Sequence, residues 1–229
     1  MANMVKAILF DMGGTLVYES GEKELRRKAL VRALRGLKSD VEELIDKAFE
    51  EWDVLSKEID YVEQWDVARV SLLLARLGIK PKPLIVEEAY RALTQSSVEG
   101  WEFEEDARET LLSLKDRGFS LGVISNTGSR EQVVRLLIKG EVIELLDVVV
   151  TSQELGVKKP HPLIFKYAEA LLGIDGKKIA YVGNDPIADI EGAKNVGWIA
   201  VQKLNRDSTR SSKADIVIRK LSDLLSYFK

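Results

Sequence analysis

The sequence predicts an α/β fold in which a parallel, Rossmann-like sheet is flanked by helices and an all-helical module is inserted after the first strand. Three observations favour this fold. Short apolar runs with the length of buried strands recur along the chain. Most of these runs are followed by a polar or glycine-containing turn and then by apolar residues at helical spacing. The stretch between residues 18 and 97 carries helical patterns alone.

The first predicted strand covers residues 5–10 (VKAILF) and is stopped by the sequence Asp-Met-Gly-Gly-Thr. Similar runs predict the remaining strands, at residues 119–125, 146–151, 178–183, 198–201 and 215–218. Helical spacing of apolar residues is found between them, at residues 107–117, 130–137, 162–172 and 187–196. Because the strands alternate with helices, we expect a parallel sheet with helices on both faces.

The insertion after the first strand is predicted to be helical, with helices at residues 23–36, 41–49, 62–77 and 85–93. Pro81 and Pro83 mark the break between the last two helices. We therefore divide the chain into a discontinuous core of residues 1–17 and 98–229 and an inserted helical domain of residues 18–97. Linkers are expected near residues 17–21 and 96–101, where Gly21 and Gly100 give the backbone freedom.

The composition limits the chemistry that this chain can perform. Its 229 residues include no cysteine and one histidine, which excludes disulfides, thiolate nucleophiles, cysteine-rich zinc sites and most Ser-His triads. The net charge of −3 gives no basic excess for a nucleic acid partner. No signal peptide or membrane span is predicted, so we expect a cytoplasmic protein with neither membrane nor nucleic acid partners. An enzyme of this composition would depend on carboxylates and lysines.

Polar residues follow the predicted strands at the carboxyl edge of the sheet, where ligands bind in open α/β sheets. They form clusters at residues 11–15, 125–128, 158–160 and 184–189. Taken singly, each cluster has an ordinary explanation as a turn, a pair of surface lysines or a helix N-cap. Taken together, they gather carboxylates that would repel one another unless a cation lies among them. Mg²⁺ is the favoured cation, because it binds one or two carboxylates together with water and a substrate phosphate.

These clusters resemble the motifs of the haloacid dehalogenase superfamily, whose members are mostly phosphatases and phosphotransferases. The resemblance covers nearly the whole chain and rests on four segments in order: FDMGGTL at residues 10–16, VISN at residues 123–126, GVKKP at residues 156–160 and VGND at residues 182–185. Pro162, Phe165 and Asp189 fit the pattern as well. The helical insertion is similar to the small helical cap domain of the family. Together the motifs are specific for the superfamily but not for a substrate.

The resemblance implies a catalytic centre built on Asp11. This residue would attack phosphorus and form an aspartyl-phosphate, which water then hydrolyses. Asp11, the backbone carbonyl of Gly13 and Asp185 would hold Mg²⁺. Asp189 would either bind the metal directly or hold one of its ligands in place. The substrate would be a small phosphorylated metabolite, and the protein would be a monomer or a weak homodimer.

The resemblance also implies where the phosphoryl group binds. Ser125, the backbone of Asn126 and Lys159 would contact its oxygens, and Gly14 and Thr15 are further candidates for binding the substrate. Lys159 would also keep the nucleophile ionised by its positive charge. We prefer Lys159 to its neighbour Lys158 because it directly precedes a proline, as in the family pattern.

The sequence departs from the family pattern at Gly13, where most phosphatases of the family carry an aspartate that protonates the leaving alcohol. Three interpretations stay open. The first is a Mg²⁺-dependent phosphatase of small phosphomonoesters, which is slow on poor leaving groups or takes an acid from the cap, with Glu19, Glu22 and Glu24 as candidates. The second is a metal-free 2-haloacid dehalogenase with the same nucleophile, against which Asp185 argues. The third is a weakly catalytic protein of the same fold that binds a metabolite.

Overall fold

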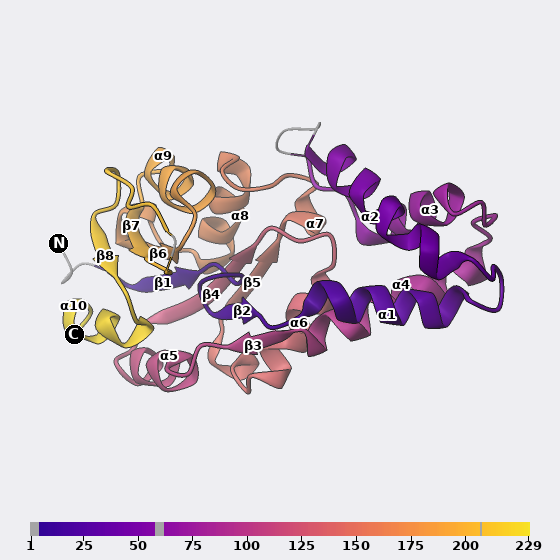
Figure 1. Cartoon of the computed structure of the whole chain (residues 1–229). Helices are drawn as coiled ribbons and strands as arrows, with labels where there is room; N and C mark the ends of the chain where they lie inside the picture. The colour runs from indigo at the N-terminus through magenta and orange to yellow at the C-terminus, as the bar shows by residue number, and fades with distance from the viewer. Residues whose placement is uncertain (1–4, 58–61, 207) are drawn as a thin grey trace.

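A computed structural model describes residues 5–57, 62–206 and 208–229. It contains a six-stranded sheet in the order β5-β4-β1-β6-β7-β8, and every pairing in it is parallel (Figure 1). The strands are β1 Ala7–Phe10, β4 Ser120–Ser125, β5 Val148–Thr151, β6 Ile179–Gly183, β7 Ile199–Lys203 and β8 Ile216–Ile218. The predicted α/β class is confirmed, and each predicted strand is found within two residues of its expected ends.

Both faces of the sheet are covered, which explains why its strands consist of uninterrupted apolar runs. In β1, Ile8 and Phe10 belong to one core with helices of one face, whereas Ala7 and Leu9 belong to a second core on the other face. The first core includes α5 Ala107–Asp116, α6 Arg130–Lys139 and α10 Leu224–Tyr227. The second includes α8 Pro162–Leu172 and α9 Gly192–Asn195.

Several short helical turns complete the core. A four-residue helix, α7, covers Ser152–Leu155, and a π-helical turn, η4, covers Pro186–Glu191. The helix predicted at residues 187–196 is therefore divided between η4 and α9. Single 3₁₀ turns lie at η2 Ile143–Leu145, η3 Gly176–Lys178 and η5 Leu221–Asp223.

The helical segment, residues 22–99, extends beyond one end of the sheet, and in it α1 and α4 run side by side (Figure 1). Its helices are α1 Glu22–Leu34, α2 Val41–Lys57, α3 Asp66–Arg76 and α4 Pro83–Glu99. They enclose an apolar core of their own, which includes Leu30, Ile45, Leu74 and Leu93. The four predicted helices are thus confirmed, although α2 and α4 are longer than expected. Among the described residues, no helix has both the length and the apolar character needed to cross a bilayer.

The two connections between the sheet and the helical segment form a small antiparallel ribbon. Strand β2 covers Val17–Glu19 and pairs with strand β3, which covers Trp101–Phe103. The sequence predicted linkers here but did not reveal the two strands, because a three-residue strand is too short to show an alternating pattern. Helix α4 also continues to Glu99, through most of the expected second linker. The two connections touch at Gly100, where a Cβ atom would overlap the Cα of Glu22.

Candidate active site

Asp11 lies immediately after β1 and is held against β6, since its backbone N–H donates to the carbonyl of Val182 at 2.9 Å. Its side chain is buried, and Oδ1 lies 2.7 Å from Nζ of Lys159, which is also buried. Lys158 is partly exposed. The structure therefore brings the expected nucleophile and the preferred lysine together at the carboxyl edge of the sheet.

The ammonium group of Lys159 is surrounded by oxygen atoms. Besides Asp11, it contacts Oδ1 of Asp189 at 2.7 Å, the hydroxyl of Tyr181 at 2.8 Å and the carbonyl of Ile124 at 3.1 Å. These are four acceptors for three N–H groups. The Tyr181 hydroxyl can accept a hydrogen bond from Lys159, because it donates its own proton to the carbonyl of Ile124 at 3.0 Å. Lys159 is thus fixed in position by the buried polar network of the sheet edge.

The pKa values in this network are strongly shifted. Burial alone would lower the pKa of Lys159, but the carboxylates of Asp11 and Asp189 outweigh it and hold that pKa well above its usual value. Burial raises the pKa of Asp11 from 3.8 to about 6; Lys159 opposes this rise, and the negative charge of Asp189 adds to it. Lys159 is therefore the charge that favours the ionised form of Asp11, which nucleophilic attack requires.

Asp189 and Asp185 follow β6 and make different contacts. Oδ1 of Asp189 contacts Lys159, and its Oδ2 accepts hydrogen bonds from the backbone N–H groups of Asn184 at 3.0 Å and Asp185 at 2.9 Å. Asp185 is exposed, and its Oδ1 caps the following turn by accepting from the N–H groups of Ile187 and Ala188. Its Oδ2 has no hydrogen-bond partner among the described residues. Both oxygens of Asp189 thus accept hydrogen bonds from the protein, whereas Asp185 is exposed and uses only Oδ1 among the described residues.

Gly14 and Thr15 brace the turn that carries Asp11. The hydroxyl of Thr15, which is fully buried, donates to Oδ2 of Asp11 at 3.2 Å and lies 3.3 Å from Oδ1 of Asn184. Gly14 has a φ of 79°, and its carbonyl accepts from Nδ2 of Asn205 at 2.8 Å. A side chain at Gly14 would collide with Asn184. Neither Gly14 nor Thr15 lines the pocket described below, so their predicted contact with the substrate stays a prediction.

A pocket of about 220 Å³ lies between the carboxyl edge of the sheet and the helical segment. Ser125 and Asn126 line it on the side of the sheet. The side chain of Asn126 also clamps the backbone of Lys159, accepting from its N–H at 2.7 Å and donating to its carbonyl at 3.1 Å. The expected phosphoryl-binding residues thus lie close together, and Asn126 has a positioning role that the sequence did not reveal.

Gly13 lies in the wall of the same pocket, beside Trp101 of β3. A Cβ atom on Gly13 would be 3.3 Å from the six-membered ring of this tryptophan, a distance shorter than most Cβ contacts in protein structures. Of the glutamates considered as replacement acids, Glu22 lines the pocket, whereas Glu19 and Glu24 are exposed and do not. The position two residues after Asp11 is therefore bordered by an indole.

Sequence reasoning missed several residues of the site, for different reasons. Tyr181 lies inside a buried strand and is indistinguishable there from an apolar core residue. Trp101 and Asp66 reach the pocket from segments far from the motifs in sequence. Lys203, at the end of β7, is buried and contacts Glu104 at 2.8 Å beside the carbonyl of Gly14. Only its position at the carboxyl end of a strand could have marked Lys203 as a candidate.

The donor set of the site fits a small hard cation with few protein ligands. The described residues include no group of three or more His, Cys, Asp or Glu side chains that could hold a metal ion. Asp11 and Asp185 follow the adjacent strands β1 and β6, and their loops touch through Thr15 and Asn184. Two carboxylates on adjacent loops suit Mg²⁺, which completes its coordination with water and phosphate oxygens, better than they suit Zn²⁺, which takes nitrogen and sulfur ligands.

Comparison with known proteins gives the family. Residues 5–197 match the haloacid dehalogenase-like hydrolases. The glyceraldehyde 3-phosphate phosphatase of Methanopyrus kandleri is 32% identical over 203 residues, which cover 87% of this chain and 84% of that protein. The crystal structure of a HAD phosphatase from Thermococcus onnurineus has a TM-score of 0.73 at 26% identity and covers 97% of both chains. A 2-haloacid dehalogenase from Pseudomonas syringae pv. Tomato DC3000 shares the fold, with a TM-score of 0.79 at 22% identity over 98% of both chains. The chain therefore belongs to the haloacid dehalogenase-like hydrolases, and the curated relatives that it resembles place it among the phosphatases of that family.

Proposed function

We propose that the protein is a Mg²⁺-dependent phosphatase that hydrolyses small phosphorylated metabolites through an aspartyl-phosphate on Asp11. The observation that supports this most strongly is the buried contact of 2.7 Å between Asp11 and Lys159 at the carboxyl edge of the sheet. Asn126, which clamps the backbone of Lys159, lines the pocket. The curated relative named above is a phosphatase of a three-carbon sugar phosphate. A pocket of about 220 Å³ suits a molecule of that size, since sites for drug-sized ligands are roughly 300–1,000 Å³.

In the proposed reaction, a carboxylate oxygen of Asp11 attacks phosphorus, and the bond from phosphorus to the leaving oxygen breaks. Water then attacks the acyl phosphate, which releases inorganic phosphate and restores the carboxylate. Lys159, the hydroxyl of Ser125 and the backbone N–H of Asn126 would bind the phosphoryl oxygens. Because the transition state is loose, aligning the reactants and neutralising their negative charge provide most of the rate enhancement.

Mg²⁺ would be held by Asp11, the carbonyl of Gly13 and Asp185. When bound, it would neutralise charge on the phosphoryl oxygens. Asp189 would act through its neighbours, because it orients Lys159 and the backbone of the loop that carries Asp185. We propose that it does not contact the metal itself.

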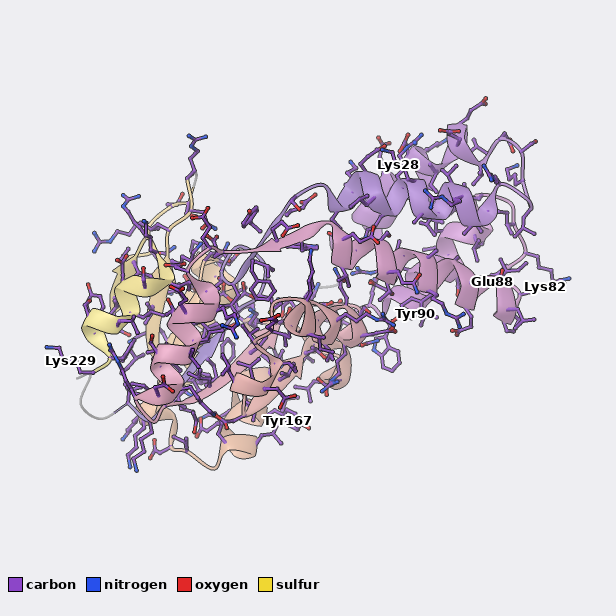
Figure 2. All side chains as sticks on the ribbon, turned by 90° about the horizontal axis from the view of Figure 1, so that it is seen from below. Lys28, Lys82, Glu88, Tyr90, Tyr167 and Lys229 are labelled. Atoms are coloured by element: carbon purple, nitrogen blue, oxygen red, sulfur yellow. The ribbon has the colours of Figure 1, made fainter. Side chains whose placement is uncertain are left out.

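We also propose that residues 18–97 act as a cap that opens to admit the substrate and closes to exclude water. The helical segment has its own core and is connected to the sheet by the ribbon of β2 and β3 (Figure 2). It also contacts the core directly, for example through the hydroxyl of Tyr90, 3.1 Å from Oγ of Ser129, and through the N–H of Asp66, which donates to the carbonyl of Gly128. A cytoplasmic protein that is a monomer or a weak homodimer remains our expectation.

Gly13 favours one alternative function, a 2-haloacid dehalogenase, because a halide leaves without a proton and needs no acid at this position. An assay of p-nitrophenyl phosphate and 2-chloropropionate, each with Mg²⁺ and with EDTA, separates the two functions. We expect phosphate release that disappears with EDTA and in Asp11→Asn. Halide release that is unaffected by EDTA would establish the alternative instead. Turnover of neither substrate, with a metabolite retained through purification, would favour a binding protein.

A further inference from the structure

The side of the pocket formed by the helical segment carries four charged side chains, which we call the charged wall: Glu22, Arg26, Asp66 and Arg69. Nε of Arg26 lies 3.2 Å from Oε1 of Glu22, and Nη2 of Arg26 lies 3.7 Å from Oδ2 of Asp66. Nη1 of Arg69 lies 3.4 Å from Oδ1 of Asp66. Each guanidinium group of the wall therefore faces a carboxylate of the same wall.

Residues around the charged wall add a third carboxylate and several neutral hydrogen-bond partners. Behind Arg69, Oε1 of Glu63 lies 3.6 Å from Nη2, and Oε2 of Glu63 accepts a hydrogen bond from the hydroxyl of Ser152. Nε of Arg26 donates to the hydroxyl of Ser97 at 2.6 Å. Glu22 accepts from the side-chain amide of Gln132 at 2.9 Å, which fixes it in place from the core. In this part of the described chain, the positive charge is matched by carboxylates before any substrate binds.

We propose that the charged wall selects phosphate esters whose leaving group is small and uncharged, with hydroxyl or carbonyl oxygens, and rejects those with a second anionic group. This inference rests on the proposed phosphatase function. A hydroxyl group can donate to Glu22 or Asp66, and a carbonyl oxygen can accept from Arg26, with no unpaired charge left behind. A second phosphate or a carboxylate would meet two carboxylates and two guanidinium groups that are already paired, so it would bring a buried charge without a partner.

The shape of the pocket limits the carbon skeleton as well. Trp101 closes the side next to Gly13, and the volume of about 220 Å³ suits a small leaving group better than a large one. We therefore expect the charged wall to act mainly on leaving groups of a few carbon atoms. A wall that leaves the second anionic group of a competing substrate unpaired gives specificity by weakening the binding of that substrate.

The test compares glyceraldehyde 3-phosphate with 3-phosphoglycerate, which share a carbon skeleton and differ by an aldehyde or a carboxylate at C1. Phosphate release gives kcat/KM for both substrates, and the ratio of the two values cancels any change in the amount of active protein. We expect the aldehyde to be preferred by about tenfold or more, because one unpaired charge costs at least that much. Glu22→Gln and Asp66→Asn each free part of a guanidinium group for the carboxylate, so each should lower this ratio by about fivefold.

Glu24→Gln is the matched control, since Glu24 lies on the same helix but is exposed and pairs with Lys28 at 3.2 Å. It should leave the ratio unchanged. The proposal is overturned if the wild-type protein hydrolyses both substrates equally well, or neither of them, or if the folded Glu22→Gln and Asp66→Asn proteins keep the wild-type ratio. If one variant fails to fold, the other decides. The proposed phosphatase function is tested separately: it is wrong if the wild-type protein shows no Mg²⁺-dependent hydrolysis of p-nitrophenyl phosphate.

Discussion

Asp189→Asn and Asp185→Asn are expected to impair the enzyme in different ways, although both change an aspartate in the loop after β6. Oδ1 of Asp189 contacts Lys159, and its Oδ2 receives two backbone N–H groups. An asparagine keeps only one acceptor oxygen, so its amide NH₂ must face either the ammonium group or the two N–H donors. Asp185→Asn leaves that network intact and removes a negative charge from the proposed metal site.

The size of the Asp189 effect follows from the contacts that are lost. One hydrogen bond between a charged donor and a carboxylate contributes about 1.5–3 kcal/mol. If this loss falls on the transition state, kcat/KM should decrease roughly 10- to 150-fold. Mg²⁺ cannot restore the activity, because the defect lies in the position of Lys159. For Asp185→Asn, we expect the Mg²⁺ concentration at half-maximal activity to rise by about tenfold or more, while activity largely recovers at saturating Mg²⁺.

The assay is a Mg²⁺ titration of p-nitrophenyl phosphate hydrolysis by the wild-type protein and both variants. Asp175→Asn is the control, because Asp175 also caps a turn, through the N–H of Lys177 at 2.9 Å, but belongs to a turn before β6 outside the pocket. This control should change neither kcat/KM nor the Mg²⁺ concentration at half-maximal activity. If excess Mg²⁺ rescues Asp189→Asn but not Asp185→Asn, the assignment of the two aspartates is reversed and Asp189 is a direct metal ligand.

In the Mg²⁺-free protein, carbon NMR of the Asp11 carboxyl group should give a pKa of about 6. Lys159→Met should raise this pKa, because the ammonium group opposes the effect of burial; an unchanged midpoint would contradict the contact. Burial raises the pKa of Asp66 above 3.8 despite the nearby arginines, so the wild-type fold loses stability as the pH rises through that pKa. Asp66→Asn should therefore melt at a higher temperature than the wild type at pH 7, with a difference that shrinks toward pH 3.8, and a difference that grows in acid would refute the argument. Gly13→Asp should accelerate hydrolysis of alkyl phosphates more than that of p-nitrophenyl phosphate. For alkyl phosphates we expect an increase of up to ~10²-fold, the lower end of what a well-placed general acid contributes. Equal or lower rates on both would show that Gly13 is more than a missing acid.

The sheet could be predicted from the sequence because burial on both faces makes each strand a continuous apolar run. The ribbon of β2 and β3 could not, since its strands have three residues each and form a separate two-stranded sheet. The same limit applies to Tyr181. Its burial in β6 is part of the apolar pattern, and its hydroxyl finds its partners only in the folded chain, where Lys159 lies at 2.8 Å and the carbonyl of Ile124 at 3.0 Å.

The motif residues of the candidate site were predictable because a parallel sheet brings its carboxyl ends to one edge. Asp11 and Lys159 are 148 residues apart in sequence and in direct contact, as that rule requires. The sequence left two roles open for Asp189, and its hydrogen bonds favour the positioning role. The charged wall was predicted only in part. Glu22 was among the candidate acids of the cap, but the pairing within the wall depends on how its helices pack on the core, which no periodicity specifies.

Gly13 and Trp101 are best explained together. Trp101 begins β3, which pairs with β2 only a few residues after the nucleophile, so the ribbon itself brings the indole to the pocket. A Cβ on Gly13 would lie 3.3 Å from Cη2 and 3.5 Å from Cζ3 of this ring. An aspartate at residue 13 would therefore require the ring to shift, and glycine lets the indole close that side of the site. The departure from the family pattern is thus a packing arrangement as well as the loss of an acid, and the gain from Gly13→Asp depends on how far the indole can move.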